Sequence, residues 1–507
     1  MNQMKTIACI AVLCLLTLLF CACGENTAEN SNNPIDGETK GDVDAKNQAE
    51  NMPEATLREN TADMLPDNLD FDGAEVRILH RDSTGGFEDW QYEITVEGEI
   101  GEIVNDAIYA RNRTVEERLN VKIASTAIPG DWGNKDNFLR TLRNSVKAGN
   151  DDYDLVAGYA YYIPTLAPEG LLYNLKDVPY LNPEAQWWSA DCAEQMSIDG
   201  KLYYITGDLA LSLLRSMDVV FFNKQVAQEL NIENLYRIVI DGEFTIDKIT
   251  ELIKDSYRDI NGDGKRDKSD MYGYATGTGN LMNAFNAAFY QPIVKKDENG
   301  IPQLALNTPK MADIVDKMHG FLHENDNVYA TPESSEADIF TIFEENRTLF
   351  MAGYLYNSDR LRAMESDYGI LPMPKQNKEQ TAHYTVSADV YSLFCIPVTC
   401  GKIDATAATM EAMCAESYRK VTPAYYEIAL KLKYSRDDET SQMLDIIRAG
   451  LRFDFGTVNA ANLNDVGSLF RRLMEEKKTD LASRYEASEK TYQASLEKLV
   501  DAYQDLP

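Results

Sequence analysis

The chain from residue 74 to residue 158 alternates between two kinds of apolar periodicity. Apolar residues alternate with polar ones, or form a short apolar run, in three predicted strands: 74–80, 121–128 and 153–158. Apolar residues recur every three or four positions in two predicted helices: 103–119 and 138–146, the second ended by Gly149. This order of strand, helix, strand, helix, strand is typical of a parallel sheet that is covered by helices on both faces.

A second group of segments begins after residues 210–218, where we place the boundary between two lobes. It contains a strand at 217–222, extended segments at 271–278, 349–356 and 368–374, and helices at 245–257, 281–290, 309–324 and 335–345. Segment 384–396 is expected to return the chain to the first lobe, before helices at 425–434, 442–451 and 481–503. We therefore predict one lobe from residues 70–215 and 390–435, and another from residues 216–389 and 436–507.

Two aromatic and polar segments follow strands of the first predicted sheet. In open α/β sheets, ligands bind beyond the carboxyl ends of the strands. Segments 81–92 and 159–162 occupy that position. We therefore expect both segments to line a binding site.

Residues 259–270, DINGDGKRDKSD, follow the spacing of a calcium-binding EF-hand loop. Gly264 stands where such a loop turns sharply. The oxygen donors at the ligand positions belong to Asp259, Asn261, Asp263, the Lys265 carbonyl, Asp267 and Asp270. The sequence therefore predicts a Ca²⁺ site, with a solvated acidic turn as the alternative.

Three features of this loop argue against a calcium switch. Asp270 replaces the usual bidentate Glu, and Arg266 stands where paired EF-hands carry an apolar residue. Helix 245–257, with Thr245 as its N-cap, precedes the loop, but an extended segment follows it. Because only half of a helix pair is present, we predict a structural Ca²⁺ in an unpaired loop.

The amino terminus has the features of a bacterial lipoprotein leader. Lys5 precedes an apolar run at 7–20, which is shorter than the roughly 20 residues of a membrane-spanning helix. Ala22 directly before Cys23 resembles a lipobox, in which the cysteine carries the lipid, and ordinary secretion is the alternative. We predict a signal peptide at 1–22, a disordered acidic tether at 23–69, and a protein lipid-anchored to the cell membrane on its extracellular or periplasmic side.

The charge of the chain narrows the range of partners. Its formal net charge is -33, from 82 acidic and 49 basic residues, without a basic stripe. This disfavours nucleic acid and direct contact with anionic lipid. Four cysteines remain beyond Cys23: Cys192, Cys395, Cys400 and Cys414. Cys395 and Cys400 are near enough in sequence to pair, and buried free thiols are the alternative.

A series of short motifs resembles the carbohydrate-type extracellular solute-binding lipoproteins of ABC importers, the family that includes maltose-binding protein. The motifs occur in the family's order: the leader with Cys23, YDLV at 153–156, GLL at 170–172, the pair Trp187 and Trp188, DGKLYYITGD at 199–208, FFNK at 221–224, GEFT at 242–245, DINGDGKRD at 259–267 followed by YGY, and YGILPMPK at 368–375.

The resemblance implies a two-lobed α/β fold of the type II periplasmic-binding-protein kind, with a hinge and a cleft that closes over a solute. It also implies a non-enzymatic, monomeric protein that delivers a small solute, commonly a sugar or oligosaccharide, to the permease subunits of an ABC importer.

Sugars present apolar ring faces edged by hydroxyl groups, so their sites pair aromatic rings with carboxylates and amides. On this basis, and by analogy with the family, the candidate ligand-binding residues are Glu88, Trp90, Tyr159, Tyr161, Trp187, Asp208, Tyr354 and Tyr356. Each candidate has a structural alternative. The tyrosines and Trp187 would otherwise pack in the core, Trp90 would be an exposed loop tip, and Asp208 would be a helix cap or a hinge contact.

Two other functions are weighed against solute binding. A secreted glycoside hydrolase would use two carboxylates as acid and base, and such a pair has no fixed spacing along a chain. A calcium-dependent adhesion protein would carry several calcium loops, whereas the sequence has one. His319 and His323 have a spacing that zinc sites use, but no third ligand pattern accompanies them, so a helix surface is favoured.

Overall fold

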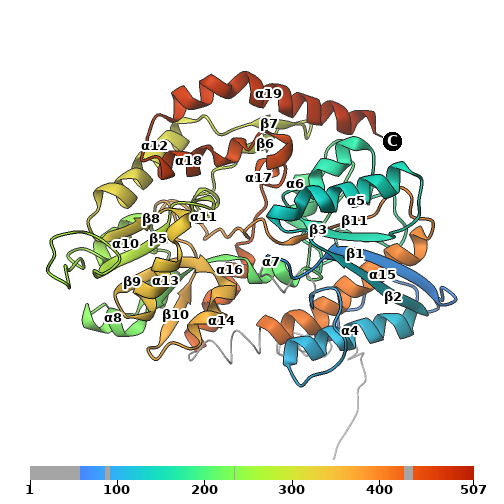
Figure 1. The fold of residues 1–507 in the computed structure, drawn as a ribbon, viewed down its shortest axis with the longest axis horizontal. Helices are drawn as coiled ribbons and strands as arrows, with labels where there is room; N and C mark the ends of the chain where they lie inside the picture. Colours follow the sequence, from blue (N-terminus) through green and yellow to red (C-terminus); the bar gives the residue numbers. More distant parts are fainter. Residues whose placement is uncertain (1–57, 86–91, 233, 427–437, 507) are drawn as a thin grey trace, which may run out of the picture. The chain divides into compact units, whose positions relative to one another are not determined.

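The computed structural model describes residues 58–85, 92–232, 234–426 and 438–506. In this part of the chain, the strands form a four-stranded sheet, a five-stranded sheet and a two-stranded hairpin. We call the four-stranded sheet with its helices lobe 1, and the five-stranded sheet with its helices lobe 2 (Figure 1).

The sheet of lobe 1 has the strand order β11-β3-β1-β2. Its strands are β1 (Ala74–Arg81), β2 (Val121–Ile128), β3 (Leu155–Tyr159) and β11 (Ser392–Cys395). The first three run parallel, as predicted, whereas β11 pairs antiparallel with β3. The carboxyl ends of β1, β2 and β3 therefore meet at one edge of the sheet.

Helices cover both faces of this sheet. Figure 1 shows α4 (Ile103–Leu119) and α15 (Ile403–Glu416) on one face and α5 (Lys135–Lys147) on the other. The helices α4 and α15 contact each other, and they also contact β2 and β1, respectively. Two short helices, α6 (Ala190–Met196) and α7 (Leu211–Arg215), precede the crossing to lobe 2.

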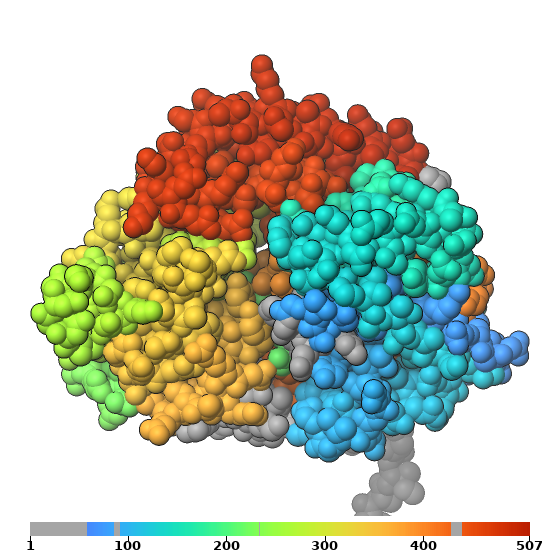
Figure 2. Space-filling model, viewed as in Figure 1, coloured from blue at the N-terminus to red at the C-terminus, as the bar shows by residue number. Residues whose placement is uncertain are grey.

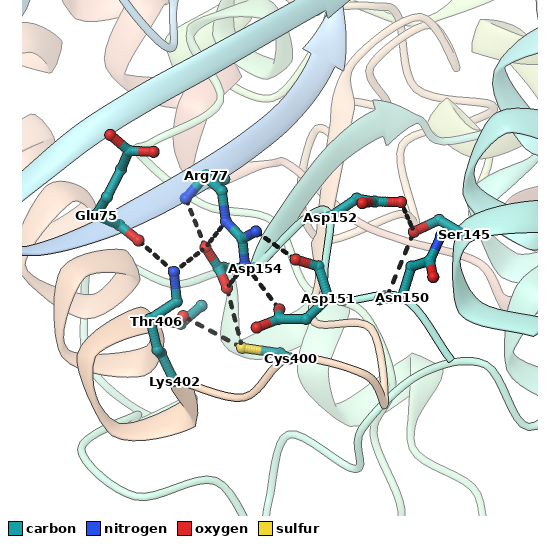
Figure 3. A network of polar contacts seen from close by, with 10 residues as sticks. All are labelled: Glu75, Arg77, Ser145, Asn150, Asp151, Asp152, Asp154, Cys400, Lys402 and Thr406. Atoms are coloured by element: carbon teal, nitrogen blue, oxygen red, sulfur yellow. Dashed lines mark hydrogen bonds and ion pairs between the residues drawn. The ribbon is translucent and has the colours of Figure 1, made fainter. Parts of the chain in front are cut away.

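A network of charges around a buried carboxylate lies where β3 begins, at the end of the sheet remote from its carboxyl edge (Figure 3). The Asp154 carboxylate is fully buried. It accepts hydrogen bonds from the backbone N–H, Nε and Nη2 of Arg77 at 2.8, 2.9 and 2.8 Å, and lies 3.1 Å from Lys402 Nζ. Because these donors surround the carboxylate, the desolvation cost of burying it is offset.

The sheet of lobe 2 has the strand order β10-β4-β9-β5-β8. Its strands are β4 (Asp218–Asn223), β5 (Tyr272–Gly277), β8 (Val328–Thr331), β9 (Thr348–Tyr354) and β10 (Tyr368–Leu371). Strand β5 is parallel to β8 and β9, whereas β4 is antiparallel to β9 and β10. The end of β9 and the start of β4 therefore lie at the same edge of the sheet.

Short helices surround the sheet of lobe 2. They are α8 (Lys224–Glu229), α9 (Leu235–Ile240), α10 (Ile246–Leu252), α11 (Leu281–Ala288), α12 (Pro309–His319), α13 (Ala337–Glu344), α14 (Ser358–Leu361) and α16 (Asp438–Ala449). Thr245 caps α10, as predicted: its hydroxyl oxygen accepts a hydrogen bond from Lys248 N at 3.1 Å. The α/β class and the two lobes predicted from the sequence are confirmed.

The last helices contact both lobes. They are α17 (Phe455–Val458), α18 (Leu469–Glu475) and α19 (Leu481–Asp505). In lobe 1, Lys201 Nζ donates a hydrogen bond to the carbonyl of Tyr503, on α19, at 3.0 Å. In lobe 2, α19 contacts α12 and β7 (Pro302–Leu304), which forms a hairpin with β6 (Val294–Lys296). This carboxyl-terminal segment is red in Figure 2.

The structure differs from the predicted tether over residues 58–69. Leu65 is buried in the core, and Asp63 accepts hydrogen bonds from Arg118 at 2.6 and 2.7 Å and from Arg419 at 2.7 Å. The sequence interpretation failed here because one apolar residue and one paired carboxylate attach a segment whose composition is otherwise polar.

Two chain segments cross between the lobes side by side. The Asp218 amide donates a hydrogen bond to the Val386 carbonyl at 3.0 Å, and the Ala388 amide donates one to the Ser216 carbonyl at 2.8 Å. Segment 384–396 thus returns to lobe 1 as predicted, where it forms β11.

The four described cysteines, Cys192, Cys395, Cys400 and Cys414, are buried and free, so Cys395 and Cys400 do not pair. None of the helices that the structure describes combines the length and apolar character of a membrane span.

Candidate functional site

Tyr159 ends β3 at the carboxyl edge of the lobe 1 sheet, and the side chain of Arg81 packs against its ring. The Arg81 side chain is fully buried, and its Nη2 donates hydrogen bonds to the Val390 carbonyl at 2.9 Å and to Ser392 Oγ at 3.0 Å. Its guanidinium carbon lies 5.2 Å from the centre of the Tyr159 ring, which allows a cation–π contact. Arg81 therefore fixes the tyrosine without reaching the surface.

Two tyrosine hydroxyls in this region donate to carboxylates from distant parts of the chain. Tyr159 donates to Asp389 at 3.1 Å, and Tyr161 donates to Asp465 at 3.2 Å. Burial raises the pKa of Asp389, and it raises the pKa of Tyr161 to about 12, with a further contribution from Asp465. The tyrosines therefore remain protonated near neutral pH, and each donates a hydrogen bond to one carboxyl group.

Lobe 2 contributes a pair of stacked tyrosines at the end of β9. The rings of Tyr354 and Tyr356 are 5.2 Å apart with an interplanar angle of 16°. Tyr354 lies opposite Asp218 in the register between β9 and β4. Burial raises the pKa of Tyr354, and the charges of Asp218, Glu336 and Asp389 raise it further. Asp389 therefore lies close enough to interact with tyrosines of both lobes.

A cavity lies beside Asp389 in the second crossing region. It is lined by Ala160 and by side chains of segments 386–391 and 452–458, among them Ser387, Tyr391, Arg452 and Asp454. Figure 2 shows a hollow in the surface between the teal part of lobe 1 and the yellow part of lobe 2. The lining thus combines one tyrosine, Tyr391, with the carboxyl groups of Asp389 and Asp454 and the guanidinium group of Arg452. Such a mixture of apolar and polar groups can hold a polar molecule with an apolar face.

Four of the predicted ligand-binding residues lie near the carboxyl groups of Asp389 and Asp465, although none of them lines the cavity itself: Tyr159, Tyr161, Tyr354 and Tyr356. Glu88 and Trp90 lie outside the described residues.

Trp187 and Asp208 have structural partners. Trp187 is buried, and its Nε1 donates to Glu411 at 3.1 Å, while Trp188 Nε1 donates to the other oxygen of Glu411 at 2.8 Å. Asp208 accepts hydrogen bonds from Thr422 at 2.5 Å and from Arg448 at 3.0 Å. Neither residue lines the cavity.

The sequence interpretation missed several residues of this region. Asp218 and Asp389 lie in the two segments that cross between the lobes. The sequence located these segments, but it did not identify the two aspartates as site residues. Trp132 follows β2, is 54% exposed, and packs edge-on against Tyr161 at 4.9 Å. The rule that selected segments 81–92 and 159–162 would have selected Trp132 as well, because it follows the carboxyl end of a parallel strand.

The predicted calcium loop is a compact turn in lobe 2. Asp259 accepts hydrogen bonds from the amides of Gly262 and Gly264 at 2.7 and 2.9 Å, and both glycines have positive φ, at 73° and 72°. Asp270 is buried and accepts a hydrogen bond from the Tyr257 hydroxyl at 3.1 Å. The carboxylate, amide and carbonyl oxygens of the loop are the hard donors that Ca²⁺ prefers.

Within the described ranges, no group of three or more His, Cys, Asp or Glu side chains is arranged to hold a metal ion. His319 and His323 lie with their rings 5.2 Å apart, and His323 Nε2 lies 2.9 Å from the Met474 carbonyl.

Comparison with known families matches residues 135–419, more than half of the 507 residues, to the bacterial extracellular solute-binding protein family. The chain belongs to this family. Its members are extracellular and bind solutes, so this extracellular solute-binding protein is a binding protein rather than the hydrolase considered as an alternative. No curated protein matches its sequence.

Solved structures of sugar-binding proteins share the fold. The galacto-N-biose/lacto-N-biose I-binding protein of an ABC transporter from Bifidobacterium longum is 11% identical, with a TM-score of 0.54 over 82% of this chain and 98% of that one. A sugar transporter from Rhizobium etli in an open conformation is 12% identical, with a TM-score of 0.53 over 86% and 100% of the two chains.

The GacH receptor of Streptomyces glaucescens is 11% identical, with a TM-score of 0.50 over 86% of this chain and 100% of that one. At these identities, the similarities establish the two-lobed fold alone.

Proposed function

We propose that this solute-binding protein captures a sugar or oligosaccharide between its lobes, at the site formed by Tyr159, Tyr354 and Asp389. The observation that carries the proposal is that Asp389, which lines the cavity, accepts a hydrogen bond from Tyr159 of lobe 1 and also lies close enough to Tyr354 of lobe 2 for its charge to act on that side chain. Aromatic rings stack on the apolar faces of sugars, and carboxylates accept hydrogen bonds from sugar hydroxyls. The sugar ligands of structurally similar proteins support the same class of solute.

The bound form is delivered to the permease subunits of an ABC importer, and the protein acts as a monomer. The Bifidobacterium longum protein is part of an ABC transporter, which supports this role. Hinge closure around the crossings at 216–218 and 386–388 would bring Tyr354 toward Tyr159 over the solute.

A calorimetric titration of the full chain against mono- and oligosaccharides tests the proposal. At least one saccharide is expected to bind saturably, without the release of products. Tyr354→Ala is expected to weaken that binding about 10-fold or more, which corresponds to about 1.4 kcal/mol, because a stacking surface is lost. Tyr180→Ala, at an exposed tyrosine that pairs with Phe71, is the matched control and should bind normally.

Two results would contradict the proposal. If no saccharide in a broad panel binds, the solute belongs to another class. If hydrolysis products accumulate during the titration, the protein is a glycoside hydrolase after all.

Two further assignments complete the proposed function. Ca²⁺ bound by loop 259–270 stabilises lobe 2 and takes no part in solute binding. A lipid on Cys23 anchors the protein to the cell membrane, and the leader at 1–22 is removed. The spacing of the oxygen donors supports the first assignment, and the leader that ends at Ala22 supports the second.

A further inference from the structure

Asp218 is a buried carboxylate without a partner at the edge of the solute site. It begins β4, its residue is only 2% exposed, and it lies opposite Tyr354 across the strand pair. Among the described residues, its side chain makes no hydrogen bond or ion pair, although its backbone amide bonds to Val386. Burial raises the pKa of Asp218 well above its usual range. Burying a carboxyl group without hydrogen-bond donors is energetically unfavourable. A ligand that supplies donors to Asp218 would reduce this cost.

Glu336 presents a second carboxyl oxygen without a partner, beside β5, the strand that flanks β9 on the side opposite to β4. Its Oε1 atom is buried and has no hydrogen-bond partner. The atom lies against Gly277, at the carboxyl end of β5, so closely that a Cβ there would be 2.4 Å away. Burial raises the pKa of Glu336 to about 7, and the neighbouring Glu333 adds to the shift. Glycine at 277 therefore leaves room for a carboxylate at the end of this strand.

The positive charges near these carboxylates do not balance them. The charges of both Asp218 and Glu336 act on Tyr354, as does that of Asp389. Two guanidinium groups, those of Arg81 and Arg471, act on Asp389. Arg81 is fully buried beneath Tyr159, and Arg471 is bound to Asn280. With Asp465, and with Asp454 and Arg452 of the cavity lining, this region has five carboxyl groups (Asp218, Glu336, Asp389, Asp454 and Asp465) and three guanidinium groups, so acidic groups are in excess.

We infer that the solute carries a protonated amino group, as in an amino sugar or an oligosaccharide of amino sugars, and that Asp218 and Glu336 accept hydrogen bonds from it. This inference rests on the proposed carbohydrate function and narrows its class of ligand. An ammonium group supplies three N–H donors and a positive charge, whereas a hydroxyl supplies one donor and no charge.

The tyrosines of the site favour the same chemistry. A cation that lies over an aromatic face is attracted by the ring, and the stacked pair of Tyr354 and Tyr356 offers such a face next to Asp218. An acidic sugar would add a negative charge to an excess of carboxylates. The site therefore selects against uronic and sulfated sugars.

The test compares matched saccharides that differ only at one substituent. Calorimetric titrations of the full chain use three monosaccharides: glucose, N-acetylglucosamine and glucosamine. They also use the β-1,4-linked oligomers of these sugars, with two to four units, and the corresponding galactose series. The amino form is expected to bind at least 10-fold more tightly than the neutral and acetylated forms. Asp218→Asn should remove most of this preference.

A second readout separates a ligand-binding role of Asp218 from a structural one. Because burial of a carboxyl group without a partner is unfavourable near neutral pH, Asp218→Asn should raise the melting temperature of the ligand-free protein. Glu336→Gln is the second variant, and it is expected to reduce the preference for amino sugars as well. Asp313→Asn, at an exposed position on α12, removes the same charge from a distant surface and should leave the preference intact.

The outcomes distinguish this inference from the proposed function. If neutral or acetylated saccharides bind as tightly as the amino forms, the amino-sugar inference is overturned and carbohydrate binding stands. If the preference persists in both Asp218→Asn and Glu336→Gln, the assignment to these carboxylates is wrong. If no saccharide binds at all, both proposals fail together.

Discussion

Asp63 and Asp218 are both buried aspartates, but only Asp63 has donors around it. Asp63 is enclosed by the guanidinium groups of Arg118 and Arg419, whereas Asp218 has no side-chain partner among the described residues. Asp63 therefore stabilises the ligand-free fold. Asp218 destabilises the ligand-free fold, and it provides a hydrogen-bond acceptor at the proposed solute site.

The effect of Asp63 on stability should depend on pH. Burial would raise its pKa, but the hydrogen bonds and charges of Arg118 and Arg419 outweigh that effect and lower the pKa from 3.8 to about 2. The carboxylate therefore stabilises the fold fully above about pH 4, and this contribution is lost as the pH falls toward 2. From the size of the shift, it amounts to about 2 kcal/mol at neutral pH.

Asp63→Asn is expected to lower the free energy of unfolding by about this amount at pH 7, as measured by urea denaturation. The difference from the natural protein should shrink as the pH falls from 4 to 2. Asp67→Asn, at an exposed position on the same segment, is the control. A difference that stays constant down to pH 2 would show that the Asp63 charge is not responsible.

At the residue scale, the sequence predicted the type of side chain at the site better than its surroundings. Tyr159 and Tyr354 end strands. Tyr159 was selected because it follows a predicted strand, and Tyr354 because of its aromatic ring and by analogy with the family. Trp187 satisfied the same chemical argument, yet it is buried with its indole N–H bound to Glu411. The partner lies 224 residues away, so no local pattern could reveal it.

At the scale of helices and strands, local periodicity was sufficient where each element has one buried face. The strand at 121–128 and the helix at 103–119 were predicted with the bounds that the structure has. The antiparallel pairing of β11 with β3 was not predicted, because this pairing joins residues more than 200 positions apart. Loop 259–270 is the element whose chemistry the sequence describes most directly.

Calcium is expected to raise the melting temperature through this loop. At a concentration 100 times the dissociation constant, a ligand bound only by the folded state stabilises it by about 2.7 kcal/mol. Addition of a chelator should reverse the increase and change the affinity for the solute less than two-fold. The measurement is thermal unfolding with and without Ca²⁺, combined with a solute titration in each condition.

Asp259→Ala should abolish the calcium effect. Asp297→Ala is the matched control, because Asp297 also accepts two backbone amides in a turn but lies outside the loop. If the chelator abolishes solute binding and leaves the melting temperature unchanged, the ion belongs to the solute site. If Ca²⁺ changes neither quantity, the loop is an acidic turn.

For the whole molecule, the sequence predicted two lobes because the helical and strand periodicities begin a new series after residues 210–218. The contacts of α19 could not be predicted in this way. Its apolar face indicates a helix, but the sequence does not show that this helix contacts Lys201 in lobe 1 and also α12 and β7 in lobe 2. The predicted domain boundaries remain a prediction.

The attachment of the whole molecule to the membrane depends on Cys23. In cells supplied with a labelled fatty acid, the natural protein should incorporate the label and sediment with membranes. Cys23→Ala should lose the label. Cys21→Ala is the control, because this residue is expected to leave with the leader. Label that persists in Cys23→Ala would refute the assignment of the anchor.

The four buried thiols have a consequence for a protein that works outside the cell. Burial raises the pKa of Cys192 to about 12 and that of Cys395 further, so neither forms an appreciable amount of the reactive thiolate. None of Cys192, Cys395, Cys400 and Cys414 takes part in a cross-link. The described fold is thus indifferent to the redox potential of its surroundings, and its assembly requires neither an oxidant nor a disulfide isomerase.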